Sequence, residues 1–316
     1  RFAADLDVLT FDHEHVPTAH LHALQAEEVV VRPGPHALPY ATDKAVMRRG
    51  LRAAGIPLPR FAVIETPEEL PEAVEAVGGW PVVLKTARGG YDGKGVWTAQ
   101  GPDESADVFL ARVPVVVEER VPFVRELAAV VARSPSGQAV SYPVVESVQR
   151  DGICVEVVAP APGLSQETAT VAQQLALEVA ERVDVVGVLA VELFELADGR
   201  VLVNELAMRP HNSGHWSIDG AATSQFENHL RAVLDLPLGP PHAITPVTVM
   251  VNVLGGDLPE LHSALRHVMA RDPGVRVHLY GKTVRPGRKV GHVTVTGDDV
   301  DSLRSRAWHA ADYISG

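Results

Sequence analysis

Two strand-like segments around Asp198-Gly199 constrain the fold most, because a hairpin fixes which side chains face each other. Residues 187–196 (GVLAVELFEL) and 200–206 (RVLVNEL) are rich in Val, Leu and Phe, a composition typical of strands. Asp-Gly is a favoured pair for a two-residue hairpin turn. The sequence therefore predicts an antiparallel hairpin over this stretch.

The predicted hairpin brings two carboxylates together. With a two-residue turn, Ala197 faces Arg200, and Glu192 lies directly opposite Glu205. Like charges in such a pair are destabilising, and a divalent cation that prefers oxygen ligands, Mg²⁺ above all, relieves the repulsion. Two alternatives stay open. Both carboxylates can face solvent at a sheet rim, and a one-residue change in the turn separates them.

A glycine-rich loop at residues 88–95 (RGGYDGKG) is the second feature, with four glycines and a lysine. It fits neither of two familiar phosphate-binding motifs. A Walker A loop needs Gly at 88 and a hydroxyl at 95, where the chain has Arg88 and Gly95. The dinucleotide-binding fingerprint needs a further Gly where the chain has Thr98. Both motifs lead from a strand into a helix.

This loop instead joins two strand-like segments, 81–86 and 95–99, so a plain hairpin turn is one interpretation. A plain turn needs one or two glycines rather than four, and Lys85, Arg88 and Lys94 surround this one. A glycine-rich hairpin can present backbone N–H groups to phosphate and close over a nucleotide as a lid. With a magnesium site, such a lid indicates nucleotide-dependent phosphoryl transfer.

Composition narrows the class of protein. The chain has 316 residues, 46% of them hydrophobic, enough for more than one domain. The net charge of −12 argues against general nucleic-acid affinity. A single cysteine, Cys154, excludes a disulfide framework and fits a reducing cytoplasm. No apolar run reaches the ~20 residues that span a membrane. We therefore expect a cytoplasmic protein without nucleic-acid or membrane partners.

Strands and helices alternate along the chain, which predicts an α/β and α+β multi-domain protein. Helices are expected at 42–54, 171–183, 223–234 and 302–314, and a proline-rich linker at 237–246. A short buried strand is expected at residues 7–11, at the very start of the sequence. We therefore expect the chain to begin inside a domain.

The residues then resemble a known family. Lys85 before a glycine-rich lid, an acidic hinge at 118–121 (EERV) and paired glutamates further on are similar to the ATP-grasp superfamily. Within it, four stretches resemble 5-(carboxyamino)imidazole ribonucleotide synthases: GGYDGKG (89–95), VPFVREL (121–127), NELAMRPHNSGHWSIDGAATSQFENHL (204–230) and HLYGKTVRPGRKVGHV (278–293). The resemblance covers essentially the whole chain.

The resemblance implies a reaction and a fold. The reaction is ATP- and bicarbonate-dependent carboxylation of the amine of 5-aminoimidazole ribonucleotide through carboxyphosphate, in purine biosynthesis, with ATP and Mg²⁺ bound. The fold is an ATP-grasp domain, expected at 42–245 with a lid subdomain at about 78–134. A Rossmann-like N-terminal domain, here incomplete at 1–41, precedes it, and a small β-rich domain at 246–316 follows. We also expect a homodimer.

The resemblance also implies roles for individual residues. Glu192 and Glu205 bind magnesium, and Asn204 belongs to the same nucleotide-contact pair but is expected on the opposite face of its strand. Arg209, Asn212 and Lys94 are the catalytic candidates. The ATP-binding residues are Lys44, Lys85, Gly89, Gly90, Tyr91, Asp92, Gly93, Lys94, Gly95, Glu118, Glu119, Arg120, Val121, Glu126, Asn204 and Glu205. The ribonucleotide ligands are Tyr91, Asp92, Lys94, Arg209, His211, Asn212, Lys282, Arg288 and Lys289.

Three alternatives accompany this interpretation. The chain could be another ATP-grasp ligase, such as a glycinamide ribonucleotide transformylase or a biotin carboxylase, but Tyr91-Asp92 and the RPHNSGHW run (209–216) argue against both. It could be a non-catalytic nucleotide-binding module, but both metal glutamates and both phosphate lysines are present. If the family resemblance is set aside, the basic stretch 282–289 is typical of a solvent-exposed turn, and His211 could be a core histidine bonded to the backbone.

Overall fold

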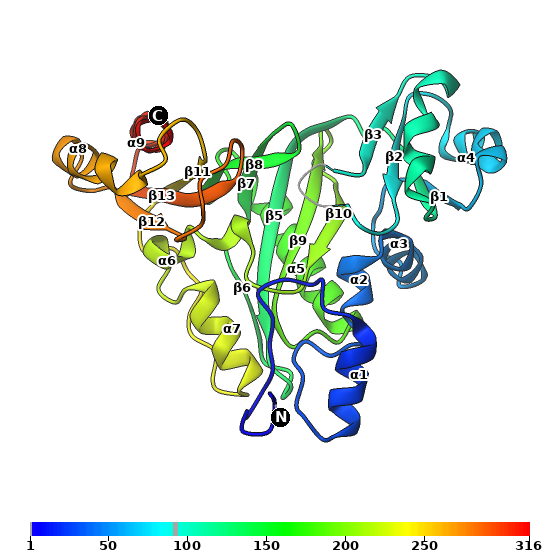
Figure 1. Ribbon diagram of the computed structural model, residues 1–316, viewed down its shortest axis with the longest axis horizontal. Coiled ribbons are helices and arrows are strands. Elements are labelled where there is room, and N and C mark those ends of the chain that lie inside the picture. Colours follow the sequence, from blue (N-terminus) through cyan, green and yellow to red (C-terminus); the bar gives the residue numbers. More distant parts are fainter. Residues whose placement is uncertain (1, 91–93) are drawn as a thin grey trace.

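The computed structural model describes residues 2–90 and 94–316 and contains a small and a large antiparallel sheet (Figure 1). The small sheet has the strand order β1-β4-β2-β3. Helix α4, with the short helix η1 before it, packs on one face over Leu84 and Val117. The bounds are β1 (Phe61–Ile64), η1 (Pro67–Glu69), α4 (Leu70–Val77), β2 (Val82–Thr86), β3 (Val96–Ala99), η2 (Pro102–Glu104), η3 (Ala106–Ala111) and β4 (Val115–Glu119).

The large sheet has nine strands in the order β10-β9-β5-β7-β8-β11-β13-β12, with β6 paired to β5. Its strands come from both the middle and the end of the chain, because β8 pairs with β11. The bounds are β5 (Phe123–Arg133), β6 (Ala139–Ser141), β7 (Val145–Arg150), β8 (Ile153–Ala159), β9 (Gly187–Leu196), β10 (Val201–Ala207), β11 (Val247–Leu254), β12 (Arg276–Leu279) and β13 (Lys289–Gly297).

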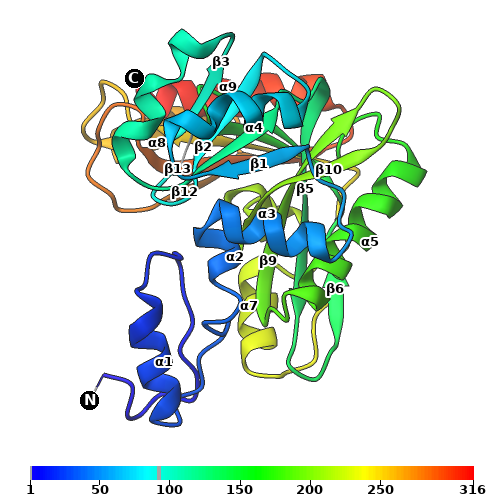
Figure 2. The same cartoon turned by 90° about the vertical axis from the view of Figure 1, so that its right-hand side faces the viewer.

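Helices cover both faces of the large sheet (Figures 1 and 2). Helix α5 buries Leu175 and Val179 against β5 and β9. On the other face, Trp216 packs on Ala128 and Ala190 beside α6 and α7. The bounds are α1 (Thr18–Ala26), α2 (Pro39–Thr42), α3 (Lys44–Ala53), α5 (Gln166–Arg182), η4 (Asn212–Gly214), α6 (Ser217–Gly220), α7 (Gln225–Val233), η5 (Leu261–Ala264), α8 (Leu265–Arg271) and α9 (Val300–Ser315).

The glycine-rich loop connects two strands, as predicted, because β2 and β3 are antiparallel neighbours on either side of it. Gly95 has a φ of +76°, and a Cβ there would lie 2.5 Å from the hydroxyl of Thr86. Both observations require glycine at this position. Tyr91, Asp92 and Gly93, to which the sequence assigned ligand roles, lie outside the described residues.

The predicted hairpin is present, but its register arises differently. The backbone N–H of Leu196 donates to the Arg200 carbonyl at 2.9 Å, so the turn has three residues and the predicted two-residue turn is wrong. A β-bulge at Asn204 then shifts the register by one residue. Glu192 therefore pairs with Glu205, and the prediction that these carboxylates lie opposite each other is confirmed.

Of two further predicted elements, the described part of the chain contains the helix but not the strand. The helix predicted at 42–54 is present as α3, which begins two residues later, at Lys44, because the Asp43 carboxylate accepts from the backbone N–H groups of Ala45 and Val46. The strand expected at 7–11 is wrong: within the described residues, Leu9 makes an isolated parallel bridge with Val31 and extends no further. None of the described helices is long and apolar enough to cross a lipid bilayer.

Candidate active site

A cavity of about 1190 Å³ lies between the two sheets. The small sheet contributes Lys85 and Glu118, and the strands of the large sheet contribute Glu126, Glu192 and Glu205. Further lining comes from the N-terminal segment and from residues 209–212, which follow β10. The candidate residues therefore converge from segments that are distant in the sequence.

A buried charge network forms one wall of this cavity. The Glu118 carboxylate accepts from Arg48 at 2.6 Å and lies 3.0 Å from the Lys85 ammonium. Burial raises the pKa of Glu118, but the charges of Arg48 and Lys85 outweigh it and lower the pKa to about 2. Lys85 also donates to Asn204 at 2.9 Å. The lysine is thus fixed between the sheets, pointing into the cavity.

The bulge at Asn204 explains this last contact and corrects an expectation. Regular alternation would place Asn204 and Glu205 on opposite faces of β10. The bulge instead places both side chains in the cavity, while Val203 faces the core with no exposure. The prediction that Asn204 points to the opposite face is therefore wrong.

Three carboxylates crowd the opposite wall. Burial raises the pKa of Glu126 to about 7, with a further contribution from Glu205. Burial, Glu205 and Glu126 together raise the pKa of Glu192. Burial would raise the pKa of Glu205 as well. The charges of Lys44, whose ammonium is 3.0 Å from the carboxylate, and of Lys85 outweigh the effect of burial, so the pKa of Glu205 is lowered. Burial and the nearness of the three carboxylates therefore both oppose full ionisation of Glu126 and Glu192.

The donor set of Glu192 and Glu205 fits Mg²⁺. Both are hard oxygen ligands that face each other across one hairpin. The described residues contain no group of three or more His, Cys, Asp or Glu side chains arranged around one metal position. Mg²⁺ commonly takes one or two carboxylates from a protein and completes its shell with phosphate oxygens and water. Two glutamates beside Lys44 and Lys85, which the resemblance assigns to phosphate, would meet that requirement.

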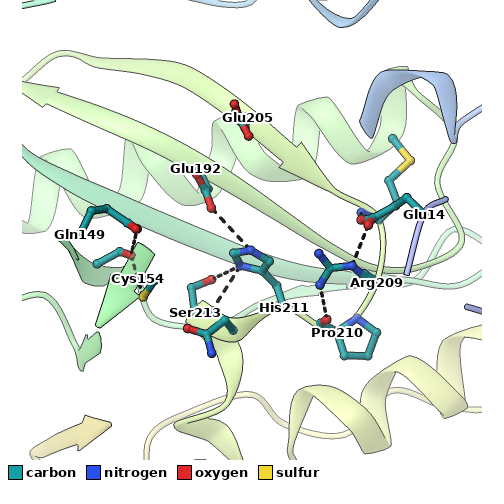
Figure 3. A network of polar contacts seen from close by, with 12 residues as sticks. Glu14, Gln149, Cys154, Glu192, Glu205, Arg209, Pro210, His211 and Ser213 are labelled. Atoms are coloured by element: carbon teal, nitrogen blue, oxygen red, sulfur yellow. Dashed lines mark hydrogen bonds and ion pairs between the residues drawn. The ribbon is translucent and has the colours of Figure 1, made fainter. Parts of the chain in front are cut away.

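Arg209 is held by the N-terminal segment (Figure 3). Its Nε donates to the Glu14 carboxylate at 2.7 Å, and its Nη1 donates to the Pro210 carbonyl at 3.1 Å. The backbone N–H of Met208 also donates to Glu14, at 3.1 Å. Glu14 therefore sets the direction of the guanidinium while both groups line the cavity.

His211 lies between Glu192 and Ser213 (Figure 3). Its Nε2 is 3.5 Å from Glu192, and its Nδ1 is 2.8 Å from the Ser213 hydroxyl. Burial, with the charges of Arg209 and Lys289, lowers the pKa of His211 to about 3. The imidazole is therefore neutral near pH 7, which suits a hydrogen-bonding rather than a charge-pairing role.

The structure brings most of the predicted site residues together. Those that line the cavity are Lys44, Lys85, Gly90, Glu118, Glu119, Arg120, Val121, Glu126, Glu192, Asn204, Glu205, Arg209, His211, Asn212 and Lys289. Gly89, Lys94, Gly95, Lys282 and Arg288 are described but are not among the lining residues. The basic turn thus reaches the cavity through Lys289.

Sequence reasoning missed Arg48, Glu14 and Asn252. Arg48 had a detectable signal, because it lies three residues before Leu51 on the apolar face of α3, and a buried charge needs a partner. Asn252 is the one asparagine in the apolar strand β11. Glu14 belongs to an irregular segment without periodicity, so its pairing with Arg209 had no local signal.

Comparison with known proteins agrees with this geometry. The model of the ATP-grasp domain family matches residues 49–226, and that of the phosphoribosylaminoimidazole carboxylase C-terminal domain matches residues 248–306. Fold and site thus define an ATP-grasp protein, and the expected fold class is confirmed.

More specific relatives share nearly the whole chain. The N5-carboxyaminoimidazole ribonucleotide synthase of Mycobacterium bovis is 57% identical over 100% of this chain and 75% of its own length. The enzyme of Thermus thermophilus has a TM-score of 0.88 and 37% identity, covering 100% of this chain and 84% of that one. The Aspergillus clavatus enzyme, solved with ADP and 5-aminoimidazole ribonucleotide, has a TM-score of 0.89 and 34% identity, covering 99% and 82%. This chain belongs to the N5-carboxyaminoimidazole ribonucleotide synthase family, which confirms the resemblance.

Proposed function

We propose that the protein is a ligase that uses ATP and bicarbonate to carboxylate the exocyclic amine of 5-aminoimidazole ribonucleotide, a step of purine biosynthesis. The observation that carries this proposal is the convergence, in one cavity, of two lysines, two opposed glutamates and the 209–212 segment. The names of the relatives supply the substrate class.

We assign the phosphates of ATP to Lys44 and Lys85, and the base to the hinge at 118–121. Glu126 faces the ribose. Glu192 and Glu205 would hold Mg²⁺, which neutralises phosphate charge when bound. Because Glu118 holds Lys85 at 3.0 Å, the lysine is oriented before nucleotide arrives, and little reorganisation is needed on binding.

The chemistry follows in two displacements. A bicarbonate oxygen attacks the γ-phosphorus, the bond to the β-phosphate oxygen breaks, and ADP and carboxyphosphate form. The amine then attacks the carboxyl carbon, inorganic phosphate leaves, and the nitrogen loses a proton. Bicarbonate is a poor electrophile until one of its oxygens belongs to a phosphate leaving group.

We place the second substrate on the opposite side of the cavity. Arg209 and Asn212 would contact bicarbonate, carboxyphosphate and the ribonucleotide, with His211 beside them. Lys289, with Lys282 and Arg288 on the same turn, would bind the ribonucleotide phosphate. The predicted lid ligands Tyr91, Asp92 and Lys94 complete this assignment. A lid that contacts both substrates would close fully when both are bound and protect carboxyphosphate from water.

An ADP-release assay tests the proposal. ADP release should rise when 5-aminoimidazole ribonucleotide and bicarbonate are added together to the protein with ATP and Mg²⁺. No rise would reject the proposal. For the lid, Asp92→Ala should raise the KM for the ribonucleotide more than the KM for ATP, and equal effects would reject the lid assignment.

The remaining expectations stay predictions. They are the domain bounds 1–41, 42–245 and 246–316, the homodimer, the cytoplasmic location, and the absence of nucleic-acid and membrane partners. The alternatives of another ATP-grasp ligase or a non-catalytic module are disfavoured by 57% identity to a carboxyaminoimidazole ribonucleotide synthase over the full chain.

A further inference from the structure

A row of polar side chains crosses the three C-terminal strands of the large sheet, β11, β13 and β12, next to residues 209–219. Asn252 on β11 pairs in register with His292 on β13, and His292 pairs with His278 on β12. Directly paired residues face the same side of a sheet. Asn252 and His292 are 3% and 1% exposed. Three neighbouring strands thus present a row of polar side chains, two of which are buried.

The segment above the row contacts each member in turn. Asn212 pairs with Asn252, the His215 and His292 rings lie 5.2 Å apart, and Asp219 accepts from His278 at 2.7 Å. The spacings of three and four residues place these contacts on one face of the helical turns η4 and α6. The row therefore fixes the register of the segment that carries Arg209, His211 and Asn212.

The Asn212–Asn252 contact is a reciprocal amide pair. Nδ2 of Asn212 donates to Oδ1 of Asn252 at 2.9 Å, and Nδ2 of Asn252 donates to Oδ1 of Asn212 at 2.7 Å. Nδ2 of Asn252 also donates to the Cys154 carbonyl at 2.9 Å. A flipped Asn252 amide would set its oxygen against that carbonyl, so the pairing has one favourable orientation.

The two asparagines differ in what remains available to a ligand. Asn252 directs both N–H groups and its oxygen to protein partners and is not among the residues lining the cavity. Asn212 lines the cavity, and among residues 2–90 and 94–316 its amide pair with Asn252 leaves one N–H and one oxygen lone pair over. The strand residue thus determines which group the cavity residue presents.

We propose that Asn252 is a positioning residue for the ribonucleotide side of the site: it fixes the amide plane of Asn212, and the row Asn252–His292–His278 holds the segment 209–219 in place. The role rests on the proposed function, in which Asn212 contacts the second substrate. Asn252 itself touches no substrate and acts through Asn212.

A double-mutant cycle tests this role. Asn252→Ala, Asn212→Ala and the double variant are compared by the KM for 5-aminoimidazole ribonucleotide, the KM for ATP and kcat. Asn252→Ala should raise the ribonucleotide KM about tenfold, the effect of roughly one lost hydrogen bond. The ATP KM should change less than about twofold. In the Asn212→Ala background, Asn252→Ala should add nothing, because the group that it positions is gone.

Thr294→Val is the matched control. Thr294 lies on the same face of β13, two residues from His292, and is fully buried. Its hydroxyl has no hydrogen-bond partner among the described residues. This variant should therefore leave both KM values unchanged. If Asn252→Ala is unstable, Asn252→Ser can replace it in the double-mutant cycle, because the serine hydroxyl is too short to complete the amide pair.

Different failures have different meanings. A wild-type protein without ribonucleotide-dependent ADP release would reject the proposed function. An active wild type would overturn the positioning role in any of three cases: Asn212→Ala leaves the ribonucleotide KM unchanged, Asn252→Ala has the same effect in both backgrounds, or the ATP and ribonucleotide KM values rise together.

Discussion

Replacing Arg48 by methionine should destabilise the protein strongly, because the change leaves a buried carboxylate with one cation instead of two. Arg48 has no exposed surface, and its Nε lies 2.6 Å from Glu118. Methionine keeps an unbranched apolar side chain in the same space without the charged guanidinium. Lys85, 3.0 Å from Glu118, is the cation that remains.

Two estimates of the loss are of the same order, a few kcal/mol. Removing one partner of a buried ion pair typically costs about 3–5 kcal/mol. Separately, the pKa of Glu118 falls from 4.5 to about 2 on folding, a net effect of about 3 kcal/mol that remains after the two cations have outweighed the cost of burying the carboxylate. Arg48 is the larger contributor after burial. We expect Arg48→Met to lower the free energy of unfolding by about 2–3 kcal/mol near pH 7.

The pKa of Glu118 also predicts how the stability difference between wild type and Arg48→Met changes with pH. Because the folded pKa of Glu118 lies below the unfolded value of 4.5, the ion pair stabilises the protein fully above that value. The stabilisation is lost as the pH falls toward about 2. The difference between wild type and Arg48→Met should therefore narrow below about pH 4.5.

Urea unfolding followed by circular dichroism, near pH 7 and near pH 3.5, measures both effects. Arg49→Met, an exposed position on the same helix, is the control and should change the unfolding free energy by less than about 0.5 kcal/mol. Equal losses in the two variants, or a gap that stays constant with pH, would contradict the buried-pair reasoning.

Three further predictions concern catalysis. Glu205→Gln should abolish turnover, since one of two opposed metal carboxylates is lost; wild-type rates would reject the metal assignment. Phe194→Ala should raise the ATP KM about tenfold. Phe194 lines the cavity, and its ring centroid lies 4.6 Å from that of Phe123, so we expect the adenine base to pack against Phe194. An unchanged ATP KM would mean that the adenine binds elsewhere. Glu14→Gln should lower kcat/KM for the ribonucleotide about tenfold by weakening the charged contact with Arg209; an equal drop for ATP would instead indicate a general structural effect.

Local pattern was sufficient for much of the fold. The strands on either side of the glycine-rich loop and the helix after Asp43 follow from turn chemistry and capping, which act over a few residues. The strand expected at 7–11 failed because strand formation depends on neighbours that the local sequence does not identify.

The opposed pair Glu192 and Glu205 was predicted from a turn that proved wrong, and the pairing holds because the bulge at Asn204 offsets the extra turn residue. Positions that depend on tertiary contacts were not predicted. The pairing of Glu14 with Arg209 joins residues that are 195 positions apart, and the amide pair of Asn212 and Asn252 joins two elements through a register that no local pattern encodes. The face of Asn204 was mispredicted because a bulge is invisible to a rule of strict alternation.

That bulge also bears on how sequences of this kind can vary in length. Before Asn204, the hairpin keeps the register of its three-residue turn, and after Asn204 it is offset by one residue. A chain lacking this asparagine would therefore form a regular ladder that still sets Glu205 against Glu192. It would lose the amide that holds Lys85. A one-residue gap at this point would thus leave the pair of carboxylates in place and remove the lysine's partner.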